Sequence, residues 1–158
     1  DLIDLIGREY TPGTTDMVFD VNGVTVGINI CFDIDDGQIL TESIDEGAQV
    51  IFASSNNADF GHTDESAQQL AIARIRAMEL GREVIASTLN SVTATIDSRG
   101  RVTNATQEFT ADHTIATVPI RDNVNASVYV APVLSWAALC VTFVAVGAAA
   151  VLSRRQPR

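Results

Sequence analysis

An α/β domain followed by one membrane-spanning helix is the fold class that this 158-residue sequence predicts, and three observations support it. Short runs rich in Val and Ile alternate with stretches of helical spacing, which is the pattern of strand–helix–strand units. Asn22-Gly23 is a two-residue hairpin signal between two of these runs. Residues 128–152 then form an uncharged run of about 25 residues, long enough to cross a hydrocarbon core of about 30 Å.

The first part of the domain is expected to hold a β-hairpin with strands over residues 17–21 and 24–31, a helix over 39–46 and a third strand over 49–53. Leu40 and Ile44 supply the helical spacing, and Gly47 ends the helix. A strand, a helix and a second strand in this order predict a parallel pair joined by a right-handed crossover.

The second part is expected to hold a polar loop over residues 54–63 and a helix over 64–80. Three strands should follow, over 83–88, 92–97 and 114–119. Thr63 is a suitable N-cap for this helix, and Gly81 ends it. Its apolar stripe consists of Leu70, Ala73, Ala77 and Leu80. On the same helix Arg76 and Glu79 are spaced to pair at i, i+3, on a face that we expect to be solvated or packed, with Glu79 and Arg82 orienting the strands beneath.

Charge sets the expected orientation in the membrane. All twenty acidic residues precede the apolar run, whereas Arg154, Arg155 and Arg158 follow it. By the positive-inside rule we expect an extracytoplasmic domain over residues 1–127, a transmembrane helix over 128–152 and a cytoplasmic Arg-rich tail over 153–158. A buried core helix is the alternative for the apolar run, and its length and one-sided Arg cluster argue against it. The strongly negative domain would be repelled by phosphates, so we expect no nucleic-acid partner.

Cys31 is the candidate nucleophile. The other cysteine, Cys140, lies in the apolar run, where it is a small apolar filler. Cys31 ends an apolar strand and is followed by a sharp turn, so its thiol and the backbone N–H of Phe32 would both be presented at the strand end. That arrangement suits attack on a carbonyl, with the amide stabilising the oxyanion. His62 and His113 are too isolated for a metal site, and we expect no cofactor.

Four motifs in order resemble the C-terminal half of the carbon–nitrogen hydrolase (nitrilase) superfamily: GVTVGINICFD, GAQVIFASSNNADFG, QQLAIARIRAMELGREV and STLNSVTATIDSRGRV. They cover most of residues 23–102. Within the superfamily the sequence is most similar to the apolipoprotein N-acyltransferase branch, because RAMELGRE is present and a membrane helix follows the domain.

The resemblance implies the second half of an αββα sandwich and a Glu–Lys–Cys triad in which Cys31 is the nucleophile. Cys31 would accept an acyl group from a phospholipid as a thioester, and the N-terminal amine of a diacylglyceryl-cysteine lipoprotein would then take it. The family's Glu and Lys are expected to lie before Asp1, in a multi-span protein. The chain contains no Lys, so we expect this part alone to be inactive. Glu9 is too close to Cys31 to be the family's glutamate, and we interpret it as a surface carboxylate.

Asp33, Asn56, Asn57 and Phe60 are the further positions expected to line the site. Asp33 stands where the family usually has Glu, Phe32 where Tyr is common, and Asp59 where an aromatic is frequent. The two asparagines are equally well explained as turn formers. A membrane-anchored amidase, with water as the acceptor, and an inactive truncated product remain as alternatives to the acyltransferase.

Overall fold

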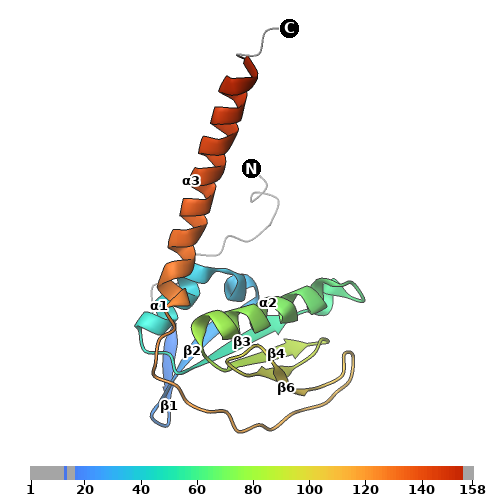
Figure 1. The fold of residues 1–158 in the computed structure, drawn as a ribbon. Coiled ribbons are helices and arrows are strands. Elements are labelled where there is room, and N and C mark those ends of the chain that lie inside the picture. The colour runs from blue at the N-terminus through green and yellow to red at the C-terminus, as the bar shows by residue number, and fades with distance from the viewer. Residues whose placement is uncertain (1–12, 14–16, 155–158) are drawn as a thin grey trace.

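The computed structural model describes residue 13 and residues 17–154, and it consists of one mixed sheet, two helices packed on that sheet and a long projecting helix (Figure 1). The expectations for Glu9, Arg155 and Arg158 fall outside the described residues.

The sheet has six strands that follow the chain in spatial order, from β1 to β6. Strands β1 (Val18–Val21) and β2 (Val24–Ile30) form the expected antiparallel hairpin. Both turn residues have positive φ, 55° at Asn22 and 84° at Gly23, as the Asn-Gly signal predicts. Strand β3 (Val50–Asn56) runs parallel to β2, and β4 (Val84–Leu89) runs parallel to β3. Strands β5 (Ala94–Ile96) and β6 (Val102–Ala105) complete the sheet in antiparallel pairing.

Helices α1 (Gly37–Asp45) and α2 (Glu65–Leu80) connect the parallel strands and cover one face of the sheet (Figure 1). Asp36 caps α1 by accepting hydrogen bonds from the N–H groups of Gln38 and Ile39. Gly81 ends α2 in the left-handed conformation, at φ 64°. The core lies between helices and sheet, and its buried apolar residues include Leu40, Ile44, Ile51, Ala73, Ala77, Leu80, Val84 and Ile96.

Each strand turns alternate side chains to this core. Gly27, Ile51 and Val84 form one cross-strand row on the covered face. A Cβ added to Gly27 would lie 2.8 Å from Ile51 Cδ1 and 3.3 Å from Ser43 Cβ of helix α1, so a larger residue here would displace its neighbours. On the opposite face Ile30 and Leu89 remain 65% and 58% exposed. The described chain therefore supplies one sheet and one helical layer, which matches the expected half of an αββα sandwich.

Three local expectations were wrong. Strand β3 continues through residues 54–56 because they pair with residues 87–89 of β4, so the predicted loop is shorter. Thr63 does not cap α2, which begins after Asp64; its hydroxyl donates instead to the Phe60 carbonyl. Residues 114–119 form no strand, because β6, which follows the turn at Gly100, already occupies the free edge of β5.

Helix α3 (Ser127–Arg154) projects away from the domain. Its span Ser127–Ala149 has a mean hydropathy of 2.0 over its most apolar window, and that window is not buried against the described domain. By length and composition this helix could cross a membrane. Its first turn is attached to the domain, since Val128 is buried and the Tyr129 hydroxyl donates to Asp45 (2.6 Å).

Candidate active site

Cys31 occupies a strained turn directly after β2. It is the first residue of the 3₁₀ helix η2 (Cys31–Asp35), and its φ is 57°. A residue other than glycine pays about 1–2 kcal/mol for this left-handed conformation. Such strain persists where the surrounding structure requires it, most often at functional sites. The half-buried thiol thus lies at the end of the strand, as the sequence predicted.

Asp33 holds the turn, and Phe32 lies in the first turn of η2. Asp33 Oδ2 accepts a hydrogen bond from the Ile30 N–H (2.9 Å), and the Asp33 carbonyl accepts one from the Asp36 N–H (3.0 Å). Phe32 lies in the first turn of η2, where helical geometry provides no acceptor for its N–H. Asp33 therefore braces the turn that contains Cys31 and Phe32.

A small pocket lies behind the thiol, between the sheet and α2. Ser55 of β3 pairs with Thr88 of β4. Ile30, the last residue of β2, pairs with Ser54, so the next residue, Cys31, lies beside Ser55. Cys31, Ser55 and Thr88 therefore form one row at the strand ends. All three line the pocket, together with Ser66 and Ser91. Its volume of about 20 Å³ admits about one water molecule. Thr88 Oγ1 is buried here and has no hydrogen-bond partner among the described residues.

Ser55 and Gln69, which line this pocket, belong to a closed hydrogen-bond cycle with Asn57. Ser55 donates to Asn57 Oδ1, Asn57 Nδ2 donates to Gln69 Oε1 (2.9 Å), and Gln69 Nε2 donates back to Ser55 (3.1 Å). Asn57 is only 2% exposed, so this cycle ties the loop after β3 to α2. Asn56 differs, because its side chain accepts from the Ala58 N–H (3.1 Å) and forms a local turn.

An apolar hollow lies next to this pocket, and Gln69 lines both. It is lined by the adjacent rings of Phe32 and Phe60, whose centroids are 6.2 Å apart, and by Ile72 and polar residues of α2. Its volume is about 260 Å³, far larger than the pocket behind Cys31. Of these two spaces, only the hollow has room for a bulky group. Phe60, which the sequence singled out, lies in this hollow.

A second buried polar cluster lies at the opposite ends of the strands. Arg82 is 2% exposed and donates to the carbonyls of Ala48 (2.8 Å, from Nε) and Asn123, while Glu83 accepts from Arg121 (3.2 Å). Burial lowers the pKa of Arg82 from its ordinary value. The partners of Arg82 are backbone carbonyls, one just before β3 and one in the segment before α3. We therefore interpret this cluster as structural, which agrees with the expectation for Arg82.

Sequence reasoning missed Ser55, Gln69 and Thr88. The only available signal was the parallel pairing, since residues that end neighbouring parallel strands meet at one edge of the sheet. The described residues contain no group of three or more His, Cys, Asp or Glu that could hold a metal ion.

Comparison with known proteins gives the family. The model of the carbon–nitrogen hydrolase family matches residues 5–125. The chain belongs to this family. Among curated relatives it is 36% identical over 98 residues to the apolipoprotein N-acyltransferase of Shewanella oneidensis, covering 62% of this chain and 19% of the relative. The enzyme of the same name from Mycolicibacterium smegmatis is 36% identical over 100 residues, covering 63% of this chain and 17% of the relative. The chain thus spans about a fifth of the length of the relatives it matches.

Solved structures confirm the fold. An amidase of the nitrilase superfamily from Nesterenkonia has a TM-score of 0.53 at 14% identity, covering 63% of this chain and 40% of that one. The Saccharomyces cerevisiae protein Nit3, a member of the same superfamily, has a TM-score of 0.51 at 19% identity, covering 62% and 39% of the two chains. At this identity the likeness concerns the fold alone, and it supports the nitrilase-like sheet and helices.

Proposed function

We propose that this chain is the C-terminal part of an apolipoprotein N-acyltransferase, and that Cys31 carries the acyl group as a thioester. The observation that carries the proposal is the strained position of Cys31 at the end of β2, in a family member whose curated relatives bear that name. The exposed apolar helix α3 supports a membrane enzyme.

The proposed reaction has two steps. The Cys31 thiolate attacks the ester carbonyl carbon of a phospholipid; the thiol proton passes to a general base and then to the departing glycerol oxygen as the ester C–O bond breaks. The N-terminal amine of a diacylglyceryl-cysteine lipoprotein then attacks the thioester. The C–S bond breaks, an amide forms, and the amine's proton returns to the sulfur. Phe32 N–H would stabilise the oxyanion in both steps.

The remaining triad members are proposed to lie in the part of the protein that this chain does not include. The chain has no Lys, and it spans about a fifth of its relatives. We therefore propose that residues 1–158 alone are inactive, and that Glu and Lys come from upstream sequence. Asp33 is proposed to act by bracing the turn, and Asn57 and Phe60 by shaping the site; the local turn made by Asn56 would support them.

We propose that the domain lies on the extracytoplasmic side, with residues 128–152 as a membrane span and 153–158 in the cytoplasm. All acidic residues precede the span and three Arg follow it, which is the charge distribution that the positive-inside rule associates with this orientation. A phospholipid donor and a lipid-modified acceptor would both be available at that membrane surface.

The test is acyl transfer to a diacylglyceryl lipopeptide by the full-length protein carrying Cys31→Ala, followed by mass spectrometry. We expect a loss of roughly 10³-fold or more, because the covalent step is removed. Cys140→Ala, in the apolar helix, is the matched control and should transfer normally. Without acceptor, the wild-type Cys31 peptide should gain the mass of one acyl chain and lose it in neutral hydroxylamine. Unchanged transfer by Cys31→Ala would remove Cys31 from the reaction.

The same experiment separates the amidase alternative. An amidase would release acid and amine from a simple amide, with water attacking the thioester, and would form no lipopeptide amide. A truncated product without function would show neither reaction in the protein as the cell makes it.

A further inference from the structure

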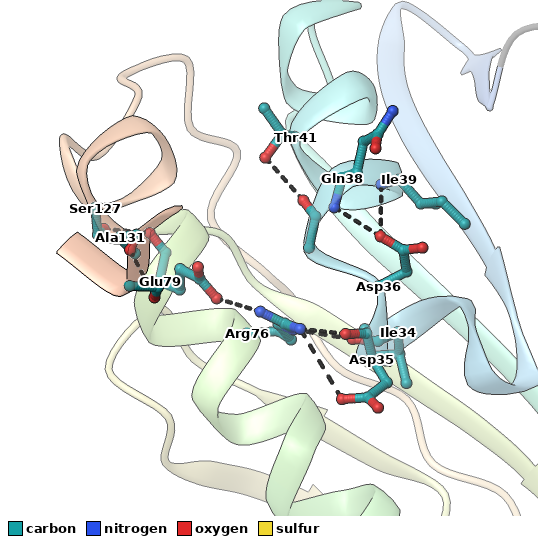
Figure 2. A network of polar contacts seen from close by, with 12 residues as sticks. Ile34, Asp35, Asp36, Gln38, Ile39, Thr41, Arg76, Glu79, Ser127 and Ala131 are labelled. Atoms are coloured by element: carbon teal, nitrogen blue, oxygen red, sulfur yellow. Dashed lines mark hydrogen bonds and ion pairs between the residues drawn. The ribbon is translucent and has the colours of Figure 1, made fainter. Parts of the chain in front are cut away.

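Arg76 of α2 joins the turn that carries Cys31 to the helix packed above it (Figure 2). Its Nε donates to the Ile34 carbonyl (3.1 Å) and its Nη2 donates to the Asp35 carbonyl. Its Nη1 pairs with Glu79 Oε2 at 2.6 Å, the i, i+3 pair that the sequence predicted. The Arg76 side chain is 17% exposed, so solvent screens these contacts only in part. All three guanidinium nitrogens are engaged.

The two carbonyls lie at the end of η2, where a helix leaves its last carbonyls without internal partners. Partial negative charge gathers at such an end, and a cation stabilises it. Because η2 has only five residues, fixing its end also restricts its start, which is Cys31 and the Phe32 amide. Asp33 braces the start of η2 and Arg76 braces its end.

Glu79 extends the link to the base of α3. While its carboxylate holds Arg76, its backbone carbonyl accepts from the Ser127 hydroxyl (2.5 Å), and the neighbouring Met78 carbonyl accepts from Asn125 Nδ2 (3.1 Å). Figure 2 shows Arg76 between η2 and Glu79, with the first turn of α3 beside Glu79. A continuous chain of polar contacts thus runs from the turn of Cys31 through α2 to the apolar helix.

We propose that Arg76 is a positioning residue for Cys31: it fixes η2 against α2 so that the thiol and the Phe32 amide keep their relative placement during acyl transfer. This inference rests on the proposed function for its activity readout. Arg76 touches no reacting atom, and its effect passes through the Ile34 and Asp35 carbonyls.

The test compares Arg76→Gln, Arg76→Lys and Arg74→Gln in the full-length protein. Arg74 is the matched control, because it lies on the same helix and its Nε donates to a backbone carbonyl far from η2, that of Gly100 (2.8 Å). Two kinds of measurement are made: the kinetics of transfer to a lipopeptide, as kcat and KM, and amide hydrogen exchange of residues 31–36 relative to β3 and β4.

We expect Arg76→Gln to lower kcat by roughly 10- to 100-fold with little change in KM, since small misplacement of reacting groups has effects of this size. Exchange over residues 31–36 should accelerate while β3 and β4 stay protected. Arg76→Lys should recover part of both, because Lys keeps the charge but cannot bridge two carbonyls. Arg74→Gln should change neither quantity.

A loss of kcat without faster local exchange, or faster local exchange with wild-type kcat, would overturn the inference. So would a general loss of protection across the sheet, which would make Arg76 a residue of overall stability. Failure of the proposed function is distinguished separately, because it appears as transfer by Cys31→Ala in protein with Arg76 intact.

Discussion

Replacing Cys31 by glycine should give a more stable protein than replacing it by alanine. Both variants remove the thiol, but alanine keeps the penalty of φ 57°, about 1–2 kcal/mol, and glycine does not. Glycine also loses more conformational freedom on folding, which costs about 0.5–1 kcal/mol. The net difference in the free energy of unfolding favours Cys31→Gly over Cys31→Ala by about 0.5–1 kcal/mol. At most positions alanine is the more stabilising of the two residues, so this order is reversed.

Thermal unfolding of the full-length protein in detergent, followed by intrinsic fluorescence, measures this order. Ala71→Gly is the control, because Ala71 is exposed in the middle of α2 and glycine there should destabilise by about 1 kcal/mol. If Cys31→Gly melts below Cys31→Ala by a similar amount, the backbone at Cys31 is not strained and the argument from strain to function fails.

Two further variants test other parts of the fold. Gly81→Ala should lower the free energy of unfolding by about 2 kcal/mol, because alanine pays the positive-φ penalty and its Cβ would lie 2.6 Å from Asn125 Nδ2, displacing a hydrogen bond at the base of α3. The control is Gly47→Ala, whose Cβ meets nothing within 4 Å and which should lose less stability. Equal melting temperatures of the two variants would contradict the predicted clash. Hydrogen bonds from the backbone N–H of Arg101 and Arg99 hold the pKa of Asp97 below its ordinary value of 3.8. A lowered folded-state pKa gives stability that is present above about pH 4 and lost below it. Asp97→Asn should therefore melt below wild type at pH 7, and the difference in melting temperature should shrink at about pH 3. A difference in melting temperature that does not depend on pH would refute the role of the Asp97 carboxylate.

The sequence predicted most of the fold because its signals were local. The Asn22-Gly23 turn, the αL position of Gly81 and the stripe of Ala73 and Ala77 each follow from a few adjacent residues, and all are confirmed. Errors arose where pairing overrode local composition. The polar residues 54–56 extend β3 because β4 offers partners for them, and no local pattern contains that information.

The candidate site divides in the same way. The position of Cys31 and Phe32 at the end of β2 could be predicted, because an apolar run followed by a turn signal is local in the sequence. Ser55, Gln69 and Thr88 could not, since they come from β3, α2 and β4 and meet only when parallel strands are set in register. Arg76 was predicted to pair with Glu79, but its contacts with η2 span about 40 positions in the sequence and need the tertiary structure.

Two sets of contacts join the apolar helix α3 to the segment that follows Cys31. Through α2, Ser127 contacts Glu79, which holds Arg76 against the end of η2. On the other side, a largely apolar groove of about 430 Å³ is lined by Gly37 and Gln38 of α1 and by the first turns of α3. Because α1 begins directly after η2, the turn carrying Cys31 lies on the side of the domain from which α3 leaves. For the proposed transfer this arrangement has a physical advantage, because an apolar surface beside α3 suits an acyl chain that comes from the membrane.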